Sequence, residues 1–139
     1  MSSPISEDLR AKVAKRAKRR CEYCLIHEDD TYFGCEVDHI ISLKHDGPTH
    51  FENLAYACFI CNRHKGSDLG SMLAPNSPLI RFFNPRIDRW HKHFRLEGSI
   101  LQALTEIGEV TSRILGFNAP ERIIERQSLI SVGRYPDLR

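Results

Sequence analysis

Two pairs of cysteines constrain this sequence of 139 residues more than any other feature. Cys21 and Cys24 form one C-x2-C motif, and Cys58 and Cys61 form a second one, separated from the first by 33 residues. Such pairs are typical of thiolate ligands to a structural zinc ion, whereas a disulfide framework is expected in short secreted chains. We therefore predict a four-cysteine zinc site. The ion would contribute binding energy on the order of 10 kcal/mol to a core too small to fold unaided.

The composition is that of a globular protein. Hydrophobic residues make up 41% of the chain and charged residues 27%, and no apolar run approaches the length of a membrane span. The polar start does not resemble a signal peptide, so we expect a soluble, cytoplasmic protein with no membrane partner. We expect a single domain over 1–139, with a core at about 10–70, a connecting segment at 70–86 and an extension at 87–139. The oligomeric state stays open.

A basic helix is predicted ahead of the first cysteine pair. Ser6 can cap its N-terminus, and apolar residues recur on one face of the residues that follow. Seven of the eleven residues from Arg10 to Arg20 are basic. We expect this face to grip the phosphates of a nucleic acid, with contacts from Arg16, Arg19 and Arg20. A face that is merely solvated is the alternative.

Between the cysteine pairs the sequence predicts two strands and a helix. Residues 32–41 favour a strand that carries Asp38 and His39 near its end, residues 53–57 a second strand, and residues 60–68 a helix. With the zinc site, this gives an α+β fold with a strand, loop, strand and helix at its centre.

The extension is predicted from weaker signals. Residues 87–96 alternate in polarity, which favours a strand, and the chain after Gly98 favours a short helix up to Leu115, ended by Gly116. Asn118 is predicted to cap a last helix that reaches about Ile130.

Three residues have no evident part in this scheme. Cys35 is left over from the two pairs, and a small buried residue is the simplest interpretation. His91 and His93 lack a third ligand nearby in the sequence, so a surface or substrate-groove position is favoured over a metal site.

The centre of the sequence also carries the residue types that phosphodiester hydrolysis needs. His39 is a candidate general base because histidine titrates near neutral pH. Asp38 and Asn62 offer a carboxylate and an amide oxygen, the ligands that magnesium prefers. Asn53 can hold the intervening loop with its amide group, and we expect a backbone carbonyl near it to orient the His39 ring. Lys65 is a candidate phosphate contact.

Together these motifs resemble the HNH endonucleases of the ββα-metal, or His-Me finger, superfamily in their zinc-binding form. The motifs are Cys21-Glu22-Tyr23-Cys24, Val37-Asp38-His39-Ile40, Asn53-Leu54, Cys58-Phe59-Ile60-Cys61-Asn62 and Lys65-Gly66. The resemblance implies that His39 is the general base, that Asp38 and Asn62 hold one metal, and that Asn53 positions the loop. This sequence departs from the family pattern in the loop after His39, where it has only Gly47 and the family usually has paired glycines. His64, two residues after Asn62, is an alternative third motif residue.

The resemblance and the residues predict a metal-dependent endonuclease that cuts DNA, most simply double-stranded DNA, with Mg2+ or Mn2+. A zinc-stabilised module that binds nucleic acid without cutting it is the main alternative. A zinc knuckle used only for protein contacts fits the cysteines but leaves the basic helix unexplained.

Overall fold

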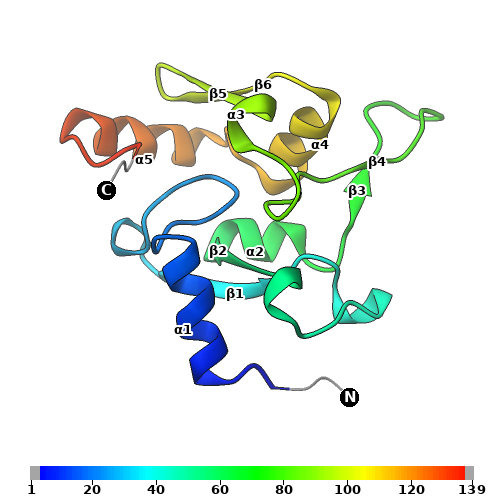
Figure 1. The fold of residues 1–139 in the computed structure, drawn as a ribbon. Helices are drawn as coiled ribbons and strands as arrows, with labels where there is room; N and C mark the ends of the chain where they lie inside the picture. Colours follow the sequence, from blue (N-terminus) through cyan, green and yellow to red (C-terminus); the bar gives the residue numbers. More distant parts are fainter. Residues whose placement is uncertain (1–3, 137–139) are drawn as a thin grey trace.

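The first half of the chain forms a helix, an antiparallel hairpin and a second helix (Figure 1). The structure is a computed structural model that describes residues 4–136. Helix α1 (Glu7–Arg16) leads to strands β1 (Cys35–His39) and β2 (Leu54–Cys58), and helix α2 (Phe59–Lys65) follows at once. Short 3-10 helices lie at Glu28–Asp30, Leu43–His45 and Phe51–Asn53. The predicted α+β class with a ββα core is confirmed.

Helix α1 begins where the sequence predicts. The Ser6 hydroxyl accepts a hydrogen bond of 3.2 Å from the backbone N–H of Leu9 and so satisfies one of the free donors of the first turn. Val13 and Ala14 are buried and pack against Leu54 of β2. The apolar face therefore fixes α1 on the hairpin and turns the basic face outward.

The hairpin is shorter than predicted at its first strand. In β1, pairing begins at Cys35, opposite Cys58, and ends at His39, opposite Leu54. Residues 31–34 turn instead of extending, and Gly34 there has a φ of +69°. All five residues of β2 are buried, because helices cover it on both faces. This accounts for the unbroken run of small and apolar residues in β2.

The second half of the chain begins with a two-stranded arm and continues with helices around another hairpin. Its elements are β3 (Gly70–Ser71), β4 (Ile80–Arg81), α3 (Trp90–His93), β5 (Phe94–Glu97), β6 (Ile100–Ala103), α4 (Glu106–Leu115) and α5 (Pro120–Ser131). They lie above the ββα core in Figure 1. No helix within residues 4–136 is long and apolar enough to cross a membrane.

The prediction of one strand over 87–96 is wrong for most of its length. Residues 90–93 form a helical turn, and the strand starts only at Phe94. The Trp90 indole N–H donates to the carbonyl of Tyr23 at 2.8 Å, and its ring packs on Phe94 at 5.1 Å between centroids. These tertiary contacts with the zinc knuckle override the local alternation.

The helix predicted after Gly98 and the cap predicted at Asn118 also need correction. The chain turns back at Gly98 into β6, and α4 begins only at Glu106, although it does end at Gly116 as predicted. Asn118 does not cap α5. Its side chain instead pairs with both backbone groups of Leu101, at 2.9 Å and 2.8 Å.

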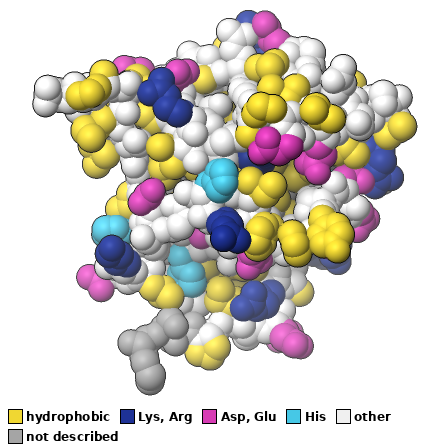
Figure 2. Space-filling model, turned by 180° about the vertical axis from the view of Figure 1, so that it is seen from behind, with side chains coloured by type: hydrophobic (Ala, Val, Ile, Leu, Met, Phe, Trp, Pro, Cys, Tyr) yellow, Lys and Arg dark blue, Asp and Glu magenta, His cyan; other side chains and the backbone are white. Residues whose placement is uncertain are grey.

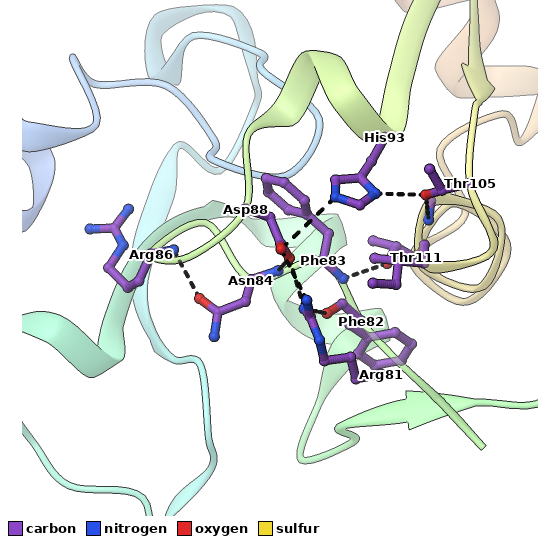
Figure 3. Close-up of polar contacts among 11 residues, drawn as sticks. Arg81, Phe82, Phe83, Asn84, Arg86, Asp88, His93, Thr105 and Thr111 are labelled. Carbon is purple, nitrogen blue, oxygen red and sulfur yellow. Dashed lines mark hydrogen bonds and ion pairs between the residues drawn. The ribbon is translucent and has the colours of Figure 1, made fainter.

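A polar network joins the 82–93 segment to α4 and β4 (Figure 3). Arg81 makes a two-pronged contact with Asp88 at 2.7 Å and 2.9 Å, which holds the pKa of that carboxyl below its ordinary value. The Nδ1 atom of His93 lies 2.6 Å from the hydroxyl of Thr105, which also caps α4. His93 thus links the 82–93 segment to the start of α4. Among residues 4–136 no metal-ligand cluster includes it.

One hydrophobic core runs through both halves. It includes Tyr23 and Ala57 from the core motif together with Phe94, Leu101 and Leu115 from the extension. This continuity supports the prediction of a single domain over 1–139, which stays a prediction.

Arg126 offers a test of how strongly the extension is tied down. Its guanidinium group is buried and donates to the carbonyls of Ser99 and Phe117, both at 2.7 Å. Arg126→Met removes both donors, so we expect the free energy of unfolding in urea to fall by about 2–4 kcal/mol. Arg95→Met is the control, because the Arg95 side chain is 56% exposed and should change stability by less than about 0.5 kcal/mol. Equal stability of the two variants would contradict this.

Candidate active site and metal centre

The four paired cysteines meet in one buried cluster. Their sulfur atoms all lie within 4.8 Å of one another, and the Sγ atoms of Cys24 and Cys58 are 3.7 Å apart. Tetrahedral zinc with Zn–S bonds of about 2.3 Å requires sulfur separations of about 3.8 Å. In each pair the second cysteine's N–H points to the first sulfur at 3.4 Å, from Cys24 to Cys21 and from Cys61 to Cys58. The cluster therefore fits the predicted structural zinc.

The extension supplies a positive charge to this cluster. Arg122 of α5 is 5% exposed, and its Nη2 atom lies 3.3 Å from the Cys61 sulfur and 3.9 Å from the Cys58 sulfur. Burial alone lowers the pKa of Arg122, but the attraction of the thiolates outweighs it and raises the pKa. Four thiolates and one Zn2+ carry a net charge of about −2, which a buried cation partly offsets. No local sequence signal identifies Arg122.

Asn53 holds the loop between β1 and β2. Its side-chain oxygen accepts from the N–H of Ile41 at 2.9 Å, and its amide nitrogen donates to the carbonyls of Ile41 and Pro48, both at 2.9 Å. Its own carbonyl accepts from the N–H of Ile40 at 2.8 Å. The loop therefore closes on itself directly after His39.

The loop keeps its tight shape with one glycine. A Cβ atom at Gly47 would lie 1.7 Å from the carbonyl oxygen of Ile41, so no other residue fits without moving the backbone. Asp46 before it adopts the left-handed conformation, with a φ of +61°, which aspartate tolerates better than most residues.

His39 lies at the end of β1, where the ladder stops. Its ring is partly exposed, and its Nε2 atom lies 2.9 Å from the hydroxyl of Thr49. The hydroxyl of Thr49, a loop residue that the sequence reasoning missed, takes the place of the expected backbone carbonyl. Burial, and then the nearby charge of Lys65, lower the pKa of His39, which favours the neutral ring.

Asp38 points the other way and is paired with a buried lysine. Lys65 of α2 is 2% exposed, its Nζ atom lies 3.0 Å from Oδ2 of Asp38, and it donates to the carbonyl of His39 at 3.1 Å. Burial raises the pKa of Asp38, and Lys65 opposes that shift. The predicted phosphate contact of Lys65 does not fit this position, because its ammonium group faces the protein interior.

Helix α2 also brings Asn62 to this side. Asn62 precedes Lys65 by three residues, so both lie on one face of the helix. Its side-chain amide is half-buried and has no hydrogen-bond partner among residues 4–136. His64 points elsewhere, since a Cβ atom at Gly116 of α4 would lie 3.0 Å from its ring. This geometry favours Asn62 over His64 as the third motif residue.

The three arginines predicted to contact a nucleic acid differ in how far their side chains are already engaged within the protein. Arg16 donates to the carbonyls of Phe51 and Leu54 and stacks over the Phe51 ring at 3.7 Å, so it ties α1 to the loop. Arg19 is exposed and lies 3.3 Å from Glu28, while Arg20 is half-buried. Contacts of all three with a nucleic acid stay predictions.

The hairpin, the helix and the four-cysteine cluster together form a compact ββα unit. Residues 21–68 match the family model described as HNH endonuclease, which confirms the resemblance. The chain thus carries an HNH endonuclease domain over these residues. Comparison with curated proteins and with solved structures found no match.

The metal centre predicts how cysteine variants behave. Cys58→Ser removes a ligand from the cluster, so we expect loss of bound zinc and a fall in the thermal unfolding midpoint of at least about 10 °C, since structural zinc supplies folding energy. Cys35→Ser is the control, because Cys35 lies outside the four-sulfur cluster and should keep one zinc per chain. Metal analysis and calorimetry measure both quantities. A zinc-free, equally stable Cys58→Ser protein would contradict the staple.

The buried ion pair between Lys65 and Asp38 leads to a second prediction, on stability. Lys65→Met leaves the buried Asp38 carboxylate without its counter-charge, and we expect a loss of about 3–5 kcal/mol in unfolding free energy at pH 7. Without Lys65 the pKa of Asp38 in the folded state rises further above its unfolded value, so acidification protonates the carboxyl and reduces the loss. Lys44→Met, at an exposed lysine of the loop, is the control. Unchanged stability with weaker DNA binding would restore Lys65 as a phosphate contact.

Proposed function

We propose that this protein is a metal-dependent endonuclease that hydrolyses phosphodiester bonds of DNA. In this proposal His39 activates water, Asp38 and Asn62 hold one divalent metal, and Asn53 positions the loop. The observation that carries it is the placement of His39. A partly exposed imidazole, in contact with Thr49 and with a pKa lowered by burial, ends the first strand of an HNH endonuclease domain.

The ring contact with Thr49 suggests which nitrogen acts. A hydroxyl that accepts the Nε2 proton selects the tautomer whose Nδ1 atom has a free lone pair. That lone pair can take a proton from water as the water attacks phosphorus. Asn53 serves this step indirectly, because it fixes the loop that carries Thr49.

The donor set fits a hard divalent ion. Asp38 supplies a carboxylate and Asn62 an amide oxygen, both suited to Mg2+ or Mn2+. Oδ2 of Asp38 forms an ion pair with Lys65 but accepts no hydrogen bond of good geometry from residues 4–136, and the Asn62 amide is similarly unpaired. When bound, the ion would stabilise charge on the leaving 3′ oxygen.

The remaining parts of the proposal concern partners and location. Arg19 and Arg20 at the end of α1 would add phosphate contacts whose strength falls with salt, and duplex DNA is the proposed substrate. The four reduced thiolates of the zinc cluster suit a reducing compartment, which supports a cytoplasmic location.

A plasmid-nicking assay with Mg2+ or Mn2+ tests the proposal. We expect His39→Ala to lower the cutting rate at least about 100-fold, because a general base typically contributes that much or more. Zinc content and thermal stability should stay close to those of the wild type, since His39 is not a cysteine ligand. His64→Ala, which changes an exposed histidine of α2, is the control and should cut normally.

The outcomes separate the competing functions. Equal cutting by the wild type and His39→Ala would remove His39 from its proposed role. Binding of DNA by both proteins with no cutting by either would favour the non-cleaving zinc module.

A further inference from the structure

A row of aromatic side chains is exposed beside the candidate active site. Tyr32 is 93% exposed and Phe33 67% exposed, and contiguous exposed apolar side chains, unlike scattered ones, often mark an interaction site. The rings of Tyr32 and Phe33 lie 4.7 Å apart, and Phe33 lies 4.7 Å from Phe59 of α2. The guanidinium group of Arg63 lies 5.7 Å from the Phe59 ring. Figure 2 shows, on one face of the molecule, hydrophobic side chains next to basic and histidine side chains at mid-height.

The aromatic row borders a small apolar pocket. The pocket has a volume of about 200 Å3 and lies between the 31–33 turn, the start of α2 and helix α5. That volume is below the range of about 300–1,000 Å3 typical of drug-sized ligands, and it suits one planar ring system. Its apolar lining comprises Ile26, Tyr32, Phe33, Cys58, Phe59 and Ile60.

The polar groups of the pocket favour a base over a phosphate. Arg122 lines it, but its donors are taken by the cluster sulfurs and by the Leu115 carbonyl at 2.7 Å. Glu125 is the other charged group in the lining. A carboxylate repels a phosphate but accepts hydrogen bonds from the amino and imino groups of nucleobases.

The pocket lies at a useful distance from His39. Phe33 is just ahead of β1 and His39 is at its far end, and the four residue-to-residue steps from Cys35 to His39 span about 13 Å. A few nucleotides of an extended strand can cover that length. Arg63 is exposed on α2, between Phe59 at the start of the helix and Lys65 at its end, so its charge is available to a backbone phosphate of such a strand.

We propose that this surface binds single-stranded nucleic acid, with one unpaired base in the pocket, stacked on Tyr32 and Phe33, and a phosphate on Arg63. The inference rests on the proposed nuclease function and narrows its substrate to duplex DNA that has unpaired nucleotides next to the cut. A fully paired duplex keeps its bases stacked and cannot fill the pocket without extruding one.

Binding to a fluorescent single-stranded oligonucleotide tests this proposal, with every variant made in the non-cutting His39→Ala protein. The double variant Tyr32→Ala/Phe33→Ala should weaken the Kd about 10-fold, since each base stacked on an aromatic ring contributes substantially to binding. Because no charge is lost, the slope of log K against log salt should not change. Arg63→Gln should instead reduce that slope by about 0.7, the value for one phosphate contact on a single strand.

Two controls make the result specific. Leu79→Ala removes another side chain that is 70% exposed, on the β3–β4 arm, and should leave the Kd unchanged. Binding to a blunt duplex of the same sequence should be affected little by the aromatic variant. Circular dichroism and zinc content verify that each variant is folded.

The alternative results overturn the proposal in distinguishable ways. If the aromatic variant binds single strands as tightly as Leu79→Ala does, the pocket is not a base site. The same holds if the variant only alters the oligomeric state in size-exclusion chromatography, which would make the surface a protein interface. In both cases plasmid nicking that depends on His39 would leave the nuclease function standing. Absence of binding to any nucleic acid, together with absence of nicking, would overturn both proposals.

Discussion

The structure depends on the contact of four cysteine sulfurs drawn from two distant segments. Cys21 and Cys24 precede the hairpin, Cys58 ends β2, and Cys61 lies in the first turn of α2. A two-stranded hairpin is at best marginally stable alone. Joining these segments sets the angle at which α2 leaves β2, and that angle brings Lys65 beneath β1. The position of α2 beneath β1, and with it that of Asn62 and Lys65, therefore depends on this four-sulfur clasp.

The extension is part of that clasp rather than an appendage. A zinc ion with four thiolates retains negative charge, and burying such charge without compensation is costly. Arg122 meets this requirement from α5, while Trp90 and Tyr135 bind the carbonyls of Tyr23 and Cys24 in the first knuckle, at 2.8 Å and 2.7 Å. The C-terminal half thereby contributes directly to the surroundings of the four-cysteine cluster.

The sequence predicts what local chemistry determines and fails where distant contacts decide. Cysteine spacing, the Ser6 cap and the Gly116 helix end are local signals, and the structure has all three. The 87–96 strand fails because Trp90 turns toward a carbonyl 67 residues away in sequence. Asn118 looks like a helix cap, but the β5–β6 hairpin offers it two backbone partners instead of one. No local pattern encodes that competition.

The candidate site shows the same division at the level of single side chains. Adjacent residues of a strand point to opposite faces, so Asp38 is turned inward and His39 outward. The sequence identifies Asp38 and His39 as a pair, but it does not identify the residue that contacts both of them although their side chains point to opposite faces. Lys65 contacts the carboxylate of Asp38 and the carbonyl of His39 with one ammonium group, so it couples the two residues through the interior. A lysine that looks like a surface contact in sequence thus becomes the link between the proposed metal ligand and the proposed base.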